Sequence, residues 1–132
     1  MIREATLRDV PSIRSLMKSV PGLWQKSWRE DVIERGINAA QGLAFVWEEG
    51  AEVLGFACAH DVGFRGYLSQ LVLAEQARKR GIGRLLVETV QKKLSERGCG
   101  IIIADVFPDA THFYRALGWK KPAAMLLRNT LS

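Results

Sequence analysis

The sequence is poor in cysteine and proline. It holds two cysteines, Cys58 and Cys99, and four prolines among 132 residues. Two cysteines are too few for a disulfide framework or a four-ligand metal site. The two histidines, His60 and His112, stand apart, without a third ligand at metal spacing. We therefore expect no metal, two free thiols and structural roles for both histidines.

Long apolar runs are also missing. A helix that crosses a bilayer needs about 18 or more consecutive apolar residues, and no run approaches that length. Residues 1–6 lack the apolar stretch of a signal peptide. The contents of 48% hydrophobic and 25% charged residues are typical of globular proteins. We expect one soluble, cytoplasmic domain spanning residues 1–132, with no membrane partner.

Basic residues outnumber acidic ones, with 19 Lys and Arg against 14 Asp and Glu and a formal net charge of +5. A basic surplus favours an anionic partner, either nucleic acid or a phosphorylated small molecule. The surplus gathers where Arg78, Lys79, Arg80 and Arg84 surround two glycines. Nucleic-acid binding favours charge spread along a face with exposed aromatic side chains. The compact cluster therefore favours the small molecule.

Hydrophobic patterning predicts a mixed α/β fold in the order β-α-α-β-β-β-α-β-α-β. Strands are expected at residues 1–5, 43–47, 52–60, 67–73, 100–106 and 123–128. Helices are expected after Asp9, after a capping box formed by Ser27 and Glu30, from about Gly81, and after Pro108. Segment 100–106 is almost continuously apolar, so we place it at the centre of the sheet, covered on both faces.

The basic cluster lies where a predicted strand passes through a short turn into a helix. Unpaired backbone N–H groups and the positive end of the helix dipole meet there. Gly81 and Gly83 lack the Cβ atoms that would keep an anion away from the backbone. These features predict a phosphate-binding turn. The nucleotide P-loop pattern is absent, and Leu86 stands where a dinucleotide fingerprint needs its third glycine.

Two segments resemble motifs of the GNAT superfamily of N-acetyltransferases. Arg78-x-x-Gly81-x-Gly83, between a strand and a helix, resembles the family's [QR]-x-x-G-x-[GA] motif. A second segment, Ala110-x-x-Phe113-Tyr114-x-x-Leu117-Gly118-Trp119, resembles A-x-x-F-Y-x-x-L-G-[FW]. The match is close from residue 67 to residue 119. It implies a single-domain GNAT-like α/β fold, a mixed central sheet of about six or seven strands flanked by about four helices.

The resemblance implies acetyl-CoA as cosubstrate and direct transfer of its acetyl group to a primary amine of a small molecule or protein. In the family the pyrophosphate rests on the backbone of the turn, and the pantetheine arm pairs with the main chain of the preceding strand. A tyrosine gives a proton to the departing thiolate. Carried over to this sequence, the turn residues are Arg78, Lys79, Arg80, Gly81, Ile82, Gly83 and Arg84, the strand residues are Leu71, Val72 and Leu73, and the tyrosine is Tyr114.

Trp24, Trp28, Glu30 and Asp31 fall in the region that covers the acceptor pocket in the family, where an acidic pair would suit a cationic amine. The general base stays open, because Tyr67 stands where members of the family often carry Glu or His. Asp61, Glu30, Asp31, or a water held by Ser69 or Tyr67 remain as candidates.

Two other functions also stay open: a basic nucleic-acid-binding module, and a CoA-binding domain without catalysis. The second is motivated by the missing base. We leave a homodimer open as well.

Overall fold

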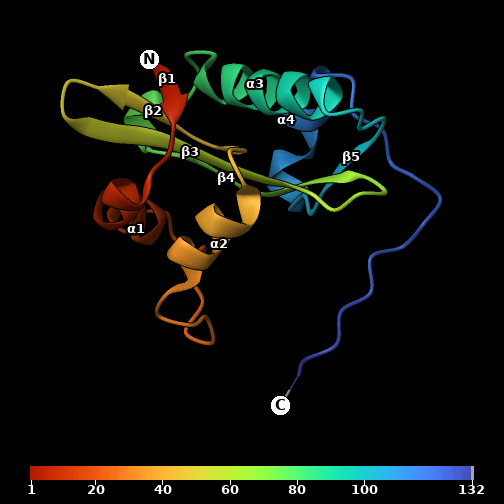
Figure 1. Ribbon diagram of the computed structural model, residues 1–132, viewed down its shortest axis with the longest axis horizontal. Helices are drawn as coiled ribbons and strands as arrows, with labels where there is room; N and C mark the ends of the chain where they lie inside the picture. The colour runs from red at the N-terminus through yellow and green to blue at the C-terminus, as the bar shows by residue number, and fades with distance from the viewer. Residues whose placement is uncertain (132) are drawn as a thin grey trace.

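The computed structural model describes residues 1–131. Within them the strands form one mixed sheet in the order β1-β2-β3-β4-β5, antiparallel except for the parallel pair β4–β5 (Figure 1). The strands are β1 (Ile2–Glu4), β2 (Ala44–Glu49), β3 (Glu52–Asp61), β4 (Gly66–Leu73) and β5 (Ile102–Ala104); the helices are α1 (Val10–Ser19), α2 (Val32–Ala40), α3 (Ile82–Glu96) and α4 (Thr111–Ala116).

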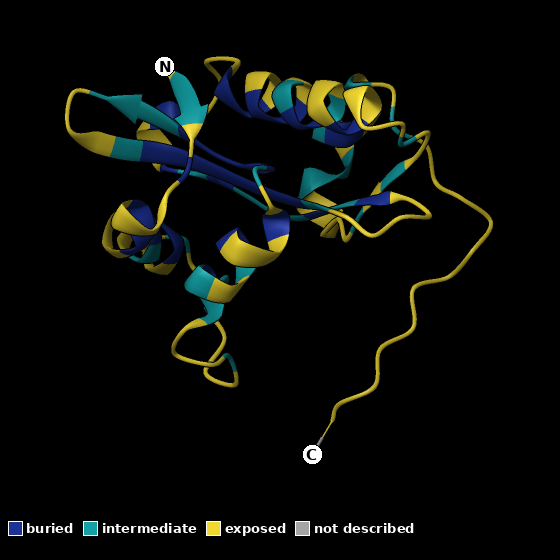
Figure 2. Cartoon of the chain, in the orientation of Figure 1, coloured by how far each residue is buried: buried dark blue, intermediate teal, exposed yellow. Residues whose placement is uncertain are grey.

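The helices cover the two faces of the sheet. α1 and α2 lie on one face, and α3 lies on the other (Figure 1). The inner side of α3 is fully buried, and so is the middle of β3 between the two helical layers (Figure 2). The predicted β2–β3 hairpin is confirmed, as is a long helix that begins immediately after Gly81. β3 and β4 therefore sit at the centre of the core, where they can hold a site rigidly.

The structure corrects the predicted position of strand 100–106. β5 is only Ile102–Ala104 and lies at the edge of the sheet, not at its centre. Ile101 and Ile103 are exposed, so an apolar run that was expected to be covered on both faces is open on one side. β5 is the edge strand because no segment among residues 1–131 pairs with its outer side.

The predicted strand 123–128 is also wrong in this structure. The segment is extended but unpaired, and it runs away from the body of the molecule with its side chains exposed (Figures 1 and 2). A strand must pair to satisfy its backbone groups, and pairing depends on the rest of the fold. The sheet within residues 1–131 therefore has five strands instead of six or seven.

The second helix begins later than its capping box predicts. Residues 24–31 form turns, and α2 starts at Val32 without a side-chain hydrogen bond at its N-cap. Trp28 consequently lies in a loop and not on a helical face. This loop closes over the same face of the sheet as α2, which makes it part of a cavity described below.

Candidate active site

β4 carries a bulge at Ser69. On β3, Cys58 pairs with Gln70 and Ala59 pairs with Leu68, so Ser69 has no partner in the register. A bulge inserts one residue, bends the strand and changes where the neighbouring side chains point. Here it allows Ser69 and its neighbour Gln70 to line the same cavity.

The other edge of β4 is open beyond the bulge. β5 pairs with Gly66–Leu68 only, and its last partner is Ala104. From Ser69 to Leu73, β4 therefore has a neighbour on one side and free backbone groups on the other, within residues 1–131. The main chain of Leu71, Val72 and Leu73 lies along this open edge. Its pairing with a pantetheine arm stays a prediction.

The turn before α3 presents backbone N–H groups. A short 3-10 turn at Glu75–Ala77 leads into Lys79 and Gly81, which both have positive φ, +60° and +78°. Between Lys79 and Arg84, no amide donates to a backbone acceptor among the described residues. These donors stand at the positive end of a 15-residue helix. The turn is therefore suited to an anion.

The two glycines of the turn have different roles. A Cβ on Gly81 would meet nothing within 4 Å, so Gly81 is needed for its left-handed φ. A Cβ on Gly83 would lie 3.1 Å from Leu73 and 3.3 Å from Phe113. Gly83 therefore also allows close packing of α3 against β4 and α4. The side chain of Ile82 is also buried, so Ile82 and Gly83 can offer only their N–H groups.

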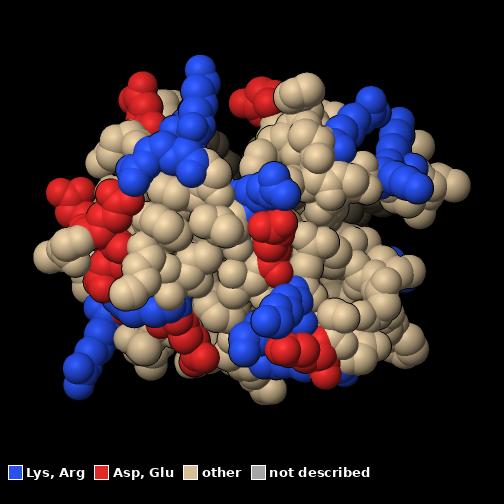
Figure 3. All heavy atoms as spheres, turned by 90° about the horizontal axis from the view of Figure 1, so that it is seen from above, with Lys and Arg blue, Asp and Glu red and all other residues tan. Residues whose placement is uncertain are grey.

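The basic side chains around the turn are partly neutralised. Arg80 forms an ion pair with Glu49 at the end of β2, and Arg84 forms one with Glu88 at 3.3 Å. Arg78 and Lys79 form no ion pair with the described residues. Acidic and basic side chains are mixed over this side of the molecule (Figure 3). The backbone amides, more than a surplus of charge, distinguish the turn.

A polar cavity of about 350 Å³ lies between α3 and α4, beside the turn. Arg84, Glu88 and Gln91 line it from α3, and Ala116 and Leu117 line it from α4 and the residue that follows. A phosphorylated ligand that meets the amides of the turn could extend along this surface.

Tyr114 is the most buried residue of α4, with 9% of its surface exposed. Its ring packs edge-on between Phe113 and Trp119, with centroids 5.0 Å away in each case. Burial raises the pKa of Tyr114 to about 12, so the phenol keeps its proton at neutral pH. Its hydroxyl makes no hydrogen bond within residues 1–131 and is free to donate to a ligand.

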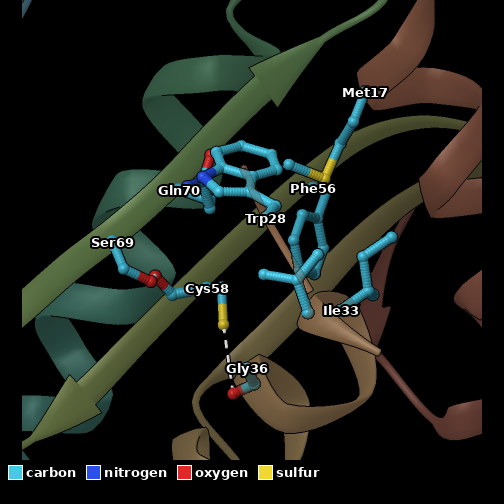
Figure 4. Close-up of a pocket in the computed structure, with 9 residues that line it drawn as sticks. Met17, Trp28, Ile33, Gly36, Phe56, Cys58, Ser69 and Gln70 are labelled. Atoms are coloured by element: carbon cyan, nitrogen blue, oxygen red, sulfur yellow. Dashed lines mark hydrogen bonds between the residues drawn. The ribbon is translucent and has the colours of Figure 1, made fainter. Parts of the chain in front are cut away.

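A second, apolar cavity of about 210 Å³ opens on the opposite side of β4 (Figure 4). Met17, Trp28, Val32, Ile33 and Phe56 form its walls. No carboxylate lines it among the described residues. Glu30 and Asp31 are exposed outside it, and Asp31 is bound to Arg35 at 2.9 Å. The acidic pair Glu30 and Asp31 therefore does not line this cavity.

The polar end of this cavity is formed by Cys58, Ser69 and Gln70. Behind it, His60 Nε2 lies 2.7 Å from Ser69 Oγ and 3.8 Å from Cys58 Sγ. Burial lowers the pKa of His60, so its ring is neutral at neutral pH. Burial also raises the pKa of Cys58 to about 11, so its sulfur stays a thiol. Its Sγ–H donates to the carbonyl of Gly36 (Figure 4).

Comparison with known proteins shows which family the chain belongs to. The family model of the acetyltransferase (GNAT) family matches residues 10–119. The chain is a member of that family. It is therefore an N-acetyltransferase that uses acetyl-CoA, and the sequence-based identification is confirmed.

Three relatives illustrate the match. The peptidyl-lysine N-acetyltransferase YiaC of Escherichia coli (strain K12) is 30% identical over 128 residues, covering 90% of this chain and 82% of that protein. The acetyltransferase AAC(6')-Iy, solved with the bisubstrate analogue CoA-S-monomethyl-acetylneamine, has a TM-score of 0.80 at 20% identity, covering 100% and 98% of the chains. Glucosamine-6-phosphate N-acetyltransferase from Arabidopsis thaliana has a TM-score of 0.77 at 16% identity, covering 98% and 97%. The two structures show the same fold.

The structure of this acetyltransferase separates the sequence-derived base candidates. Tyr67 donates its hydroxyl to Asp105 at 3.1 Å, and Asp61 accepts the N–H of Gly63 at 2.9 Å. Neither lines the apolar cavity, whereas Ser69 does. Trp28 lines it too, and Trp24 supports Trp28 from outside with ring centroids 5.2 Å apart.

Sequence reasoning missed the pairing of His60 with Ser69, because the bulge that creates it has no sequence signature. The nearest signal is that predicted strands 52–60 and 67–73 follow one another along the chain. No helix in residues 1–131 is long and apolar enough to cross a membrane. No cluster of three potential metal ligands occurs in the same part of the chain.

We predict that Gly81→Val weakens acetyl-CoA binding by about tenfold or more, whereas Lys79→Ala weakens it by less than about fivefold. Valine cannot adopt the left-handed φ that aims the amides of the turn, while lysine contributes one exposed charge. Isothermal titration calorimetry measures both affinities.

Gly22→Val is the matched control, because Gly22 has the same φ of +78° and open surroundings but lies in the loop after α1. We expect Gly22→Val to lower the stability of the fold about as much as Gly81→Val does, and to leave the affinity for acetyl-CoA unchanged. Equal losses of affinity in Gly81→Val and Lys79→Ala would show that the turn is only a charged patch.

Proposed function

We propose that residues 1–132 form one acetyl-CoA-binding domain that acetylates a primary amine carried at the end of an apolar arm, as in the side chain of lysine. The observation that carries this proposal is the apolar cavity beside Ser69, with its aromatic walls and its polar end. The four methylene groups of a lysine fit such walls, and the amine then meets the polar end.

The cavity also argues against polycationic acceptors. An amino sugar with several ammonium groups needs carboxylates to replace the water it loses on binding. The carboxylates nearest in sequence, Glu30 and Asp31, are exposed to solvent outside the cavity. The E. coli relative is named for peptidyl-lysine, which supports the lysine acceptor. The aminoglycoside and glucosamine-phosphate enzymes share the fold only.

For the cosubstrate, we propose that the amides from Arg78 to Arg84 bind the pyrophosphate and that the open edge at Leu71, Val72 and Leu73 pairs with the pantetheine arm. Free N–H groups at the helix start and a strand with one unpaired edge support this arrangement. The thioester supplies the activated acetyl group. It would then lie beside β4, with the acceptor cavity on the other side of the bulge.

We propose Tyr114 as the group that donates a proton to the departing thiolate. Its phenol is protonated, largely dry and without a hydrogen-bond partner among residues 1–131. Phe113 packs on Gly83, so α4 lies against the start of α3, next to the turn. A proton delivered there keeps a thiolate, with an ordinary pKa near 8.5, from leaving as a bare anion.

We place the protein in the cytoplasm, because Cys58 and Cys99 are both free thiols and a reducing compartment keeps them so. We propose no nucleic-acid partner, since the basic residues of the turn are interspersed with acidic ones.

The acceptor is tested by comparing a peptide with one lysine, the same peptide with arginine in its place, and an aminoglycoside. Release of free CoA thiol reports turnover. We expect kcat/KM for the lysyl peptide to exceed that for the other two by about tenfold or more. A preference for the aminoglycoside would contradict the proposal.

Gly36→Ala gives a matched variant for the same test. Gly36 lines the cavity, and an added Cβ would lie 3.7 Å from Cys58 Sγ, which is ordinary contact. Alanine favours a helix by about 0.5–1 kcal/mol over glycine, so Tm should not fall. We expect a higher KM for the lysyl peptide and an unchanged affinity for acetyl-CoA. An unchanged KM would exclude this cavity as the acceptor site.

Tyr114→Phe keeps the ring and its packing but removes the phenol. We expect kcat to fall by about ten- to a thousandfold, with acetyl-CoA affinity changed by less than about fivefold, because the lost interaction acts mainly in the transition state. Steady-state kinetics and calorimetry measure the two effects. Unchanged turnover, with chemistry rate-limiting, would leave Tyr114 as a structural residue.

We also propose a homodimer in which segment 123–128 of each copy pairs with the free edge of the other copy's β5. Met125, Leu126 and Leu127 are 81%, 72% and 83% exposed, and the β5 edge carries the exposed side chains of Ile101 and Ile103. A reciprocal exchange covers both apolar surfaces and satisfies both sets of backbone groups.

Sedimentation analysis tests the dimer. We expect the wild type to sediment as a dimer and Leu126→Asp as a monomer, because a carboxylate cannot enter the covered surface without loss. Leu131→Asp, beyond the pairing segment, is the control and should remain dimeric. A monomeric wild type, including one in which the segment folds back on its own β5, would overturn this assembly.

A further inference from the structure

We propose that Ser69 and His60 form a two-residue proton relay that takes the proton released by the acceptor amine. The proposal rests on the function proposed above. It answers a question that the sequence left open, namely which group serves as the base, and it assigns that role to a histidine expected to be structural.

Ser69 is placed for this role by the bulge in β4. It has no partner in the β3–β4 register, and it lines the cavity that we assign to the amine. His60, on β3, does not line the cavity but lies directly behind Ser69, with Nε2 2.7 Å from Oγ. The amine would therefore meet the hydroxyl first, and the imidazole would act through it.

The hydrogen bonds around Ser69 allow a proton to pass from the amine, through the Ser69 hydroxyl, to His60. Its single hydroxyl proton can go either to the carbonyl of Cys58, at 3.1 Å, or to His60 Nε2. With Nε2 unprotonated, Ser69 donates to it, and Oγ keeps a lone pair for the amine N–H. After transfer the imidazolium is favoured by the carbonyl of Ala39 in α2, which raises the pKa of His60 against the effect of burial.

The groups that face His60 leave it neutral in the resting enzyme. From its own strand comes the thiol of Cys58, and from β4 come the hydroxyl of Ser69 and the ring of Tyr67, whose centroid is 6.3 Å away. The phenol of Tyr67 donates to Asp105 at 3.1 Å. Burial dominates, so the pKa of His60 lies below its ordinary value of about 6.5 and the ring can accept a proton at neutral pH.

A neutral amine enters the apolar cavity, and its nitrogen forms a bond to the acetyl carbon while the carbon–sulfur bond breaks. The amine proton passes to Ser69 Oγ, and the Ser69 proton passes to His60 Nε2. Tyr114 gives its proton to the CoA thiolate. His60 then returns one proton to solvent, and Tyr114 takes one up, which restores the enzyme.

The relay predicts how the rate depends on pH. A protonated His60 cannot accept a second proton, so activity is present above the His60 pKa and is lost as pH falls through it. The single-turnover rate of lysyl-peptide acetylation, with both substrates saturating, should therefore show an acid limb below about pH 6.5.

His60→Gln should remove this limb and lower the rate by about a hundredfold. Ser69→Ala should do the same without disturbing the ring, and the double variant should be no slower than either single variant. Ser69→Thr keeps the hydroxyl and should restore most of the rate. His112→Gln, an exposed histidine on α4, is the control and should keep both rate and limb.

The results distinguish failure of the relay from failure of the proposed function. If the wild type acetylates no amine, the function itself is wrong. If the wild type is active but His60→Gln and Ser69→Ala keep its rate and acid limb, or if their losses multiply in the double variant, the relay is overturned. Tm values and acetyl-CoA affinities of all variants show whether each has folded.

Discussion

The site depends on the way β4 is paired. One edge of β4 pairs with β3 along its whole length, except at one extra residue. The other edge pairs with β5 only at the start of the strand. The extra residue, Ser69, places its hydroxyl beside Gln70 at the polar end of a mostly apolar cavity. The early end of the β5 pairing leaves backbone groups free from Ser69 to Leu73. In our proposal, one strand therefore serves two ligands, a cosubstrate along its edge and an acceptor beside its bulge. β4 is held in the core by β3 and α3.

In the proposal, the two ligands are bound by different kinds of group, backbone for the cosubstrate and side chains for the acceptor. In the proposed arrangement, the cosubstrate meets mostly backbone groups, from the open edge of β4 to the amides before α3, so few side chains are specific to it. The proposed acceptor cavity is lined by side chains from α1, α2, β3, β4 and the loop at Trp28. This division explains why the cosubstrate motif could be identified in the sequence, while the acceptor site could be described only from the fold. It also explains why substitutions at the acceptor cavity should alter specificity without altering acetyl-CoA binding.

Most local signals were predictable from sequence, the capping box at Ser27 and Glu30 excepted, and features that depend on distant partners were not. The hairpin, the start of α3 after Gly81 and the Arg78–Gly83 motif rest on adjacent residues, and each was found where expected. The placement of strand 100–106 and of segment 123–128 depends on what pairs with them, and both predictions were wrong. The bulge has no sequence signature, so the contact of His60 with Ser69 could not be foreseen. The close packing of Phe113 against Gly83 also depends on the fold and has no sequence signal.

The central claim is that acetyl-CoA is held by the open edge of β4 and by the amides before α3. Backbone hydrogen exchange with and without saturating acetyl-CoA tests it most directly, because exchange reports each amide. We expect slower exchange within residues 69–73 and 79–84, and similar slowing with CoA, which keeps the phosphates and the pantetheine arm. Unchanged exchange in both segments, with binding established by calorimetry, would contradict the claim and place the cosubstrate elsewhere on the molecule.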